Sequence, residues 1–248
     1  MKKNIILLGI ELSPVDMDQA LQIVVENISA KSAGYFCFAN IHVVMEGNRR
    51  PEIRNILSDS TANFPDGMGV AWALKLLGHK FHDRVRGADF MLKLCEHAAL
   101  HNLKVFFYGN TEETLEKLKN RLKALFPGLE IAGSASPPFR PLTRQEDDAY
   151  IKQINDSGAD ILFVSLGAPK QEKWMAEHKG GIKAIQLGVG AAFSFITGKV
   201  KEAPKWMQKA GLEWLFRLPQ QPQKTIYRMS LVPEFLLRTL LQLVKRNL

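Results

Sequence analysis

Short segments that are apolar throughout alternate along this chain with longer segments whose apolar residues recur at helical spacing. A strand that is apolar on both faces must be covered on both faces, which is typical of parallel strands joined by helices. The alternation therefore predicts an α/β fold with a Rossmann-like, mainly parallel sheet covered by helices. The predicted strands are Asn4–Leu8, Tyr35–Ala39, Leu103–Tyr108, Leu129–Ala132, Ile161–Leu166 and Ala184–Leu187. The predicted helices lie near 14–30, 42–58, 67–77, 87–101, 111–125, 143–156 and 169–179.

The positive charge of the chain is concentrated at its C-terminal end. The 248 residues carry a formal charge of +8, and residues 199–248 hold ten Lys or Arg against three acids, a net charge of +7. This shift predicts an α/β core over residues 1–198 and a helical, basic C-terminal appendage over residues 199–248. A basic segment indicates a polyanionic partner, which can be nucleic acid, anionic lipid or the phosphates of a substrate.

The end of the appendage has a second property. Residues 231–248 have helical spacing, with a wide leucine-rich face and a basic stripe. One interpretation is a helix in the interface of an anionic membrane, where each Lys or Arg contributes about 1 kcal/mol. The other is a helix docked on its own domain or on a second subunit, and the leucine-rich face predicts a homo-oligomer. Nucleic acid is disfavoured because aromatic residues are not interleaved with the basic ones.

The cysteines and the apolar runs bear on the compartment. Cys37 and Cys95 both have apolar neighbours, which predicts buried, reduced thiols and a cytoplasmic protein. No stretch reaches the roughly 18 consecutive apolar residues that a membrane span requires. We therefore expect a protein that is soluble or lies on a membrane surface without crossing it.

Polar and glycine-rich turns follow several predicted strands. Asn40 follows the second strand, Gln171 belongs to the turn after the fifth, and Gly188 and Gly190 follow the sixth. A further turn, Phe64-Pro-Asp66-Gly-Met-Gly69, precedes a predicted helix. Ligands of parallel α/β sheets bind beyond the carboxyl ends of the strands. We expect these turns to surround a phosphate-bearing small molecule.

Two charged side chains near these turns are candidates for chemistry. Asp66 lies between Pro65 and a flexible Gly-x-Gly, and it is either the N-cap of the following helix or a general base. Arg84 lies in a cationic segment before another predicted helix, where it makes either a surface ion pair or a forked contact with a phosphate.

Other patterns leave alternatives open. Gly188-x-Gly190 begins like a dinucleotide-binding turn, which keeps a nucleotide-dependent oxidoreductase or epimerase as an alternative function, although Phe193 replaces the third glycine. Asp16 and Asp18 have the D-x-D spacing of metal-dependent sugar transferases, but acids in a first helical turn need no metal. We expect neither a catalytic metal nor a cofactor. A non-catalytic protein that binds a membrane surface through its basic end is a further alternative.

Five segments, spread over nearly the whole chain, carry a joint signal. They are Phe64-Pro-Asp66-Gly-Met-Gly, Arg84-Val-x-Gly-x-Asp89, Gly167-Ala-Pro-Lys-Gln-Glu172-Lys-Trp, Gly188-Val-Gly-Ala-Ala-Phe193, and Ala203-Pro-Lys-Trp-Met through Gly211-Leu-Glu-Trp-Leu-Phe-Arg217-Leu. In their order and spacing they resemble the WecG/TagA/CpsF family of bacterial glycosyltransferases. The resemblance implies inverting, metal-independent transfer of N-acetylmannosamine or a related hexose. The sugar would pass from a UDP-sugar to a glycan on a polyprenyl diphosphate, in teichoic acid or exopolysaccharide synthesis at the cytoplasmic face of the membrane.

The resemblance also implies roles for single residues. The family's catalytic aspartate falls on Asp66, its arginine before Gly-x-Asp on Arg84, and its Pro-x-Gln-Glu glutamine on Gln171. The asparagine of its sheet loop falls on Asn40. These four positions are expected to act on the sugar donor and its acceptor.

In the family, the C-terminal appendage closes over the site and supplies three arginines. The first matches Arg217, the second falls on Lys224, and the third falls on Tyr227 with Arg228 beside it. We expect Arg217, Lys224 and Arg228 to bind the diphosphate. Other departures from the family's pattern are Phe38 for Thr, Ser194 for Asp and Glu202 for Arg. The departures concern donor specificity and the phosphate contacts of the appendage.

Overall fold

A parallel sheet forms the centre of the molecule, as the sequence predicts. The computed structural model describes residues 4–79 and 84–246, and within them the sheet has six strands in the order β4-β3-β8-β7-β5-β6. All five strand pairs in this sheet are parallel. The strands are β3 (Tyr35–Ala39), β4 (Ala62–Pro65), β5 (Lys104–Gly109), β6 (Glu130–Ala135), β7 (Ile161–Ser165) and β8 (Ile185–Gly188). The α/β class is thereby confirmed.

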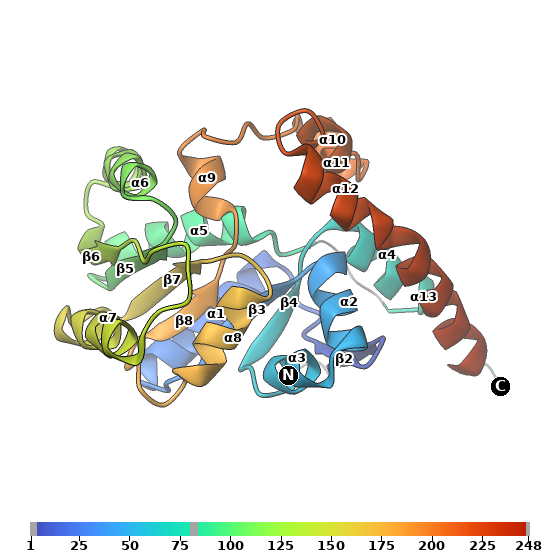
Figure 1. Ribbon diagram of the computed structural model, residues 1–248, viewed down its shortest axis with the longest axis horizontal. Helices are drawn as coiled ribbons and strands as arrows, with labels where there is room; N and C mark the ends of the chain where they lie inside the picture. The colour runs from blue at the N-terminus through green and yellow to red at the C-terminus, as the bar shows by residue number, and fades with distance from the viewer. Residues whose placement is uncertain (1–3, 80–83, 247–248) are drawn as a thin grey trace.

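Helices cover both faces of the sheet (Figure 1). They are α1 (Met17–Ser29), α2 (Ile41–Arg49), α3 (Pro51–Ser58), α4 (Met68–Leu76), α5 (Gly87–Leu100), α6 (Glu112–Leu125), α7 (Arg144–Asp156), α8 (Lys170–Glu177) and α9 (Ala192–Ile196). Side chains of β3 alternate between two apolar clusters: Tyr35 and Cys37 join α2, α3, α4, α7 and α8, whereas Phe36 and Phe38 join α1, α5, α6 and α9. Because β3 is buried on both sides, its sequence is apolar without alternation.

The structure differs from the predicted elements at three places. The predicted first strand lies outside the main sheet, because Leu8 and Gly9 have positive φ angles and turn the chain back. The strand β1 (Ile5–Leu7) therefore pairs with an antiparallel β2 (Ile10–Leu12). The predicted helix over 42–58 is two helices, since α3 begins at Pro51, a residue suited to the first helical position. The edge strand β4 was not predicted.

Helices continue to the end of the described chain. They are α10 (Lys205–Lys209), α11 (Glu213–Arg217), α12 (Pro222–Ser230) and α13 (Val232–Arg246). In Figure 1 they run along the end of the molecule that carries α2 and α4. Phe235 and Leu231 of this segment are buried in the cluster that contains residues of both helices. The Gln242 side chain accepts a hydrogen bond from the Leu8 N–H at 2.8 Å and donates one to the Ile6 carbonyl at 2.8 Å.

One face of α13 remains in solvent. Its exposed apolar residues are Leu236, Leu237, Leu240, Leu241 and Val244. The sequence left open whether this helix docks on its own domain or on another surface, and the structure shows docking through one face with a second apolar face uncovered. Among the described helices, none has both the length and the apolar character that a bilayer span requires.

Candidate active site

Three neighbouring strands direct polar turns to one edge of the sheet. The order β4-β3-β8 is parallel, so the carboxyl ends of these strands lie together. Asp66 follows β4, Asn40 follows β3 and Gly190 lies two residues beyond β8. The sequence motifs that are separated along the chain thus meet at the edge where open α/β sheets bind ligands.

Asp66 is held by its backbone and leaves its carboxylate available. Its N–H donates to the Ala39 carbonyl at 3.1 Å, and the Pro65 carbonyl accepts from the Val85 N–H at 2.8 Å. The N-cap of α4 is Gly67, whose φ of 84° lies in the left-handed region that favours glycine. The interpretation of Asp66 as the cap is therefore wrong. Within residues 4–79 and 84–246, its partly buried carboxylate makes no hydrogen bond.

Charged groups from three parts of the chain surround Asp66. Burial raises the pKa of Asp66 to about 6, while the nearby Arg84 guanidinium lowers that pKa, Glu213 raises it, and Arg86 and Arg217 lower it further. Arg228, on α12, also interacts electrostatically with the Asp66 carboxylate. A carboxyl group with a pKa near neutrality is suited to accept a proton.

Ion pairs organise these cations. Glu213 Oε1 lies 2.6 Å from Arg84 Nη2, and Glu213 Oε2 lies 2.8 Å from Arg217 Nη2. Arg86 is buried, and its guanidinium contacts Glu202 at 2.9 Å and Asp89 at 3.1 Å. The segment 202–217 is therefore fastened to the loop before α5 through charged side chains.

An aromatic ring completes this cluster. The guanidinium carbons of Arg86 and Arg217 lie 5.2 Å and 4.7 Å from the centre of the Phe195 ring, within the range of cation–π contacts. Glu202 stands where the family pattern has arginine, and its carboxylate pairs with Arg86. Phe38, in place of the family's threonine, is buried against the rings of Phe64 and Phe90.

Of the other predicted site residues, Asn40 lies beside the turn that follows Asp66, whereas Lys224 is exposed. Asn40 caps α2 by accepting from the Val43 N–H at 3.2 Å, and its Cβ lies beside Gly67. Lys224, at the start of α12, is exposed and forms no ion pair or hydrogen bond with any residue in the described part of the chain. Tyr227 donates a hydrogen bond to Glu46 Oε1 at 3.1 Å, so at the family's third arginine position this chain has a contact with α2.

The Gln171 side chain makes its hydrogen bonds to other residues of the chain. Its amide Nε2 donates to the Gly188 carbonyl at 2.7 Å and to Glu172 Oε1 at 2.9 Å. Its Oε1 accepts from the Gly167 N–H at 3.2 Å and the Gly190 N–H at 3.1 Å. Four hydrogen bonds use the whole capacity of an amide side chain. Gln171 thus fixes two turns relative to each other. The N–H of Gly190, in a turn expected to surround a phosphate-bearing molecule, already donates a hydrogen bond within the chain.

Sequence reasoning assigned no site role to Glu213, and it noted Glu202 only as a departure from the family pattern. The spacing of Glu213 and Arg217, four residues apart, is the signal that predicts their ion pair within a helix. No local pattern indicates that Glu213 also reaches Arg84, because that contact depends on the tertiary structure. The pair of Arg86 with Glu202 joins residues 116 positions apart and is likewise invisible in the sequence.

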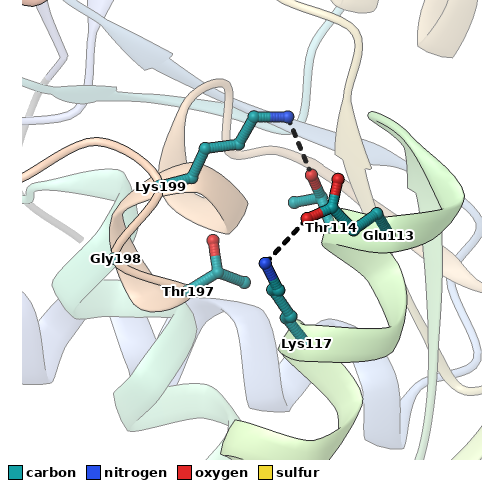
Figure 2. Close-up of a pocket in the computed structure, with 6 residues that line it drawn as sticks. All are labelled: Glu113, Thr114, Lys117, Thr197, Gly198 and Lys199. Atoms are coloured by element: carbon teal, nitrogen blue, oxygen red, sulfur yellow. Dashed lines mark hydrogen bonds and ion pairs between the residues drawn. The ribbon is translucent and has the colours of Figure 1, made fainter.

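A separate shallow pocket lies between the first turn of α6 and the end of α9 (Figure 2). Two lysines line it, and both are engaged: Lys117 pairs with Glu113 at 2.7 Å, and Lys199 donates to Thr114 Oγ1 at 3.2 Å. Both lysines of this pocket are thus held by side chains of α6.

Comparison with known proteins adds to this geometry. The family model described as glycosyl transferase WecG/TagA/CpsF family matches residues 5–248. A relative from Bacillus spizizenii is 30% identical over 216 residues, which cover 84% of this chain and 79% of the relative. A relative from Bacillus subtilis is 30% identical over 187 residues, which cover 75% of this chain and 71% of the relative. Both relatives are named N-acetylglucosaminyldiphosphoundecaprenol N-acetyl-beta-D-mannosaminyltransferase.

Proposed function

This chain belongs to the WecG/TagA/CpsF family and is a glycosyltransferase, and we propose that it moves N-acetylmannosamine from UDP to a lipid-linked acceptor. The acceptor is N-acetylglucosamine on a polyprenyl diphosphate, in agreement with the names of the two relatives. The observation that carries the reaction type is the Asp66 carboxylate, which lies near the arginines at the carboxyl edge of the sheet and has a pKa of about 6.

The proposed chemistry is a single in-line displacement. Asp66 removes the proton from an acceptor hydroxyl, the oxygen attacks C1 of the donor sugar, and the bond from C1 to the diphosphate oxygen breaks. One displacement at C1 inverts its configuration. Negative charge grows on the leaving UDP, and preorganised guanidinium groups stabilise that charge. Arg84, Arg217 and Arg228 are the groups proposed for this role.

The uncovered face of α13 supports the proposed position of the enzyme. A polyprenyl acceptor is anchored in the membrane, so its diphosphate is reached from the bilayer surface. Exposed leucines and basic residues on one segment are suited to that surface, and each buried methylene contributes about 0.8 kcal/mol. We place the enzyme peripherally on the cytoplasmic face of the membrane, with the appendage as the docking element.

A screen of donors tests the proposal. Purified protein is incubated with a short-chain polyprenyl diphosphate carrying N-acetylglucosamine and with each of several UDP-sugars, and release of UDP is measured. The proposal expects UDP-N-acetylmannosamine to give the fastest release, dependent on the acceptor and equal with and without EDTA. Acceptor-independent release, or no release with any UDP-sugar, would refute it.

A further inference from the structure

Glu213 lies between two arginines that come from different parts of the chain. Each of its carboxylate oxygens contacts one guanidinium, Oε1 with Arg84 at 2.6 Å and Oε2 with Arg217 at 2.8 Å. The three side chains retain only 16%, 12% and 25% of their exposure, respectively, so solvent screens these ion pairs weakly. The carboxylate is thus the internal counter-ion of two cations that face Asp66.

This arrangement matches what a diphosphate would need. Guanidinium groups bind the oxygens of carboxylates and phosphates with the same forked geometry. Two of them brought together without an anion would repel each other in a partly desolvated site. Glu213 Oε1 is buried and contacts Arg84 only as an ion pair, without a properly directed hydrogen bond. A phosphate oxygen can therefore replace it.

We propose that Glu213 is a positioning residue that holds Arg84 and Arg217 beside Asp66 in the unloaded enzyme and yields both guanidiniums to the donor diphosphate. The inference deepens the proposed function and rests on it. It adds a role for an acid that the sequence motifs did not assign. It also explains how Arg84, before α5, and Arg217, in α11, keep one geometry when no substrate is bound.

Two consequences separate this role from a merely structural one. First, the diphosphate competes with Glu213, so removing the negative charge makes UDP bind more tightly. Second, Glu213 opposes ionisation of Asp66, so its removal lowers the pKa of Asp66. The charged groups that face Asp66 are Arg84, Arg86, Glu213, Arg217 and Arg228. The four groups other than Glu213 are cations, which already favour the ionised form of Asp66. When Glu213 is neutralised, the acid limb of the profile of kcat/KM against pH must therefore move to lower pH.

The test uses the 248-residue chain with Glu213→Gln, which keeps the size of the side chain and one acceptor oxygen but removes the negative charge. Titration calorimetry measures the Kd of UDP, and steady-state kinetics measure the dependence of kcat/KM on pH. We expect UDP to bind about threefold to tenfold more tightly, a change of roughly 0.7–1.4 kcal/mol. We also expect the acid limb of the profile to shift to lower pH. Unchanged or weaker UDP binding, or an unmoved acid limb, would overturn the inference.

Two further variants make the result specific. Glu213→Asp keeps the charge and should leave the acid limb near its wild-type position, even where its shorter side chain weakens the contact. Glu234→Gln removes another ion pair between the appendage and the core, the one with Arg49, and should change neither the Kd of UDP nor the acid limb. An effect of Glu234→Gln equal to that of Glu213→Gln would show that loosened docking is the cause.

The wild-type enzyme distinguishes the two proposals. If it releases no UDP from any UDP-sugar, the proposed function fails, and the binding measurement with UDP alone still decides the role of Glu213. If it turns over the donor but Glu213→Gln behaves like wild type in both measurements, the positioning role fails and the proposed function stands.

Discussion

At the scale of the residue, the site depends on which polar groups the backbone leaves unused. Gly67 adopts the positive φ at the start of α4 and takes the capping position, so the Asp66 carboxylate is free to react. Gln171 shows the opposite case, because its amide is consumed by the glycine turns. The sequence predicted site roles for both positions, but it could not tell a carboxylate that makes no hydrogen bond among the described residues from an amide whose hydrogen bonds are all made within the chain. That difference lies in tertiary hydrogen bonds.

The raised pKa of Asp66 predicts the pH dependence of the reaction. A general base must be ionised, so kcat/KM should rise tenfold per pH unit below about 6 and level off above it. The measurement is kcat/KM from pH 5 to pH 8 at constant ionic strength. A profile that is flat between pH 5 and pH 7 would show that no group with the pKa of Asp66 limits the reaction.

Replacing Gln171 tests its structural role. Gln171→Ala removes the side-chain hydrogen bonds to the partly buried Gly190 N–H and the buried Gly188 carbonyl, and it should lower the free energy of unfolding by about 2–4 kcal/mol. Turnover should fall as well, because both turns lose their relative position. Chemical denaturation measures the loss, with Gln145→Ala on the exposed surface of α7 as the control. Equal stability of Gln171→Ala and wild type would mean that the amide serves a ligand instead.

At the scale of the element, α13 has two apolar faces with different partners. Phe235 is buried against the core, as is Leu231 just before the helix, whereas Leu237 and Leu241 are 58% and 52% exposed. The helical pattern in the sequence predicted the helix and its amphipathic character. It could not assign the faces, because the surface that covers Phe235 is built from α2 and α4, which lie far away in the sequence.

The two faces should respond differently to substitution. The double change Leu237→Gln with Leu241→Gln should reduce binding to vesicles of anionic lipid about tenfold or more and leave Tm unchanged, because no described core contact is lost. Phe235→Ala should instead free the helix and increase proteolytic cleavage in residues 219–246, since large core truncations cost about 3–5 kcal/mol. Undiminished vesicle binding of the double variant would remove α13 from the membrane interface.

At the scale of the whole molecule, the alternation of apolar strands and helices was sufficient to predict the parallel sheet. What it could not supply was the order of the strands and the exclusion of β1 from the sheet. The edge strand β4 is four residues long and ends at Pro65, too short for its pattern to stand out. The sequence also placed the positive charge at the C-terminal end, and the structure brings Arg217 and Arg228 from that end to Asp66.

The appendage is therefore expected to be part of the catalytic unit. A chain that ends at residue 218 lacks Arg228 and uncovers the apolar surface of α2 and α4. We expect its turnover with the lipid-linked acceptor to fall at least a hundredfold, while circular dichroism retains the signal of an α/β core. Full activity of the shortened chain would separate residues 219–248 from catalysis.

The central claim is that the Asp66 carboxylate takes the proton of the acceptor hydroxyl. The most direct measurement compares kcat/KM of Asp66→Asn with that of wild type in the UDP-release assay near neutral pH, together with Tm. Turnover should fall by about 10²–10⁴-fold. Tm should stay equal or rise, because burial disfavours the ionised carboxylate in the folded state and asparagine removes that charge. Wild-type turnover in a folded Asp66→Asn variant would contradict the claim.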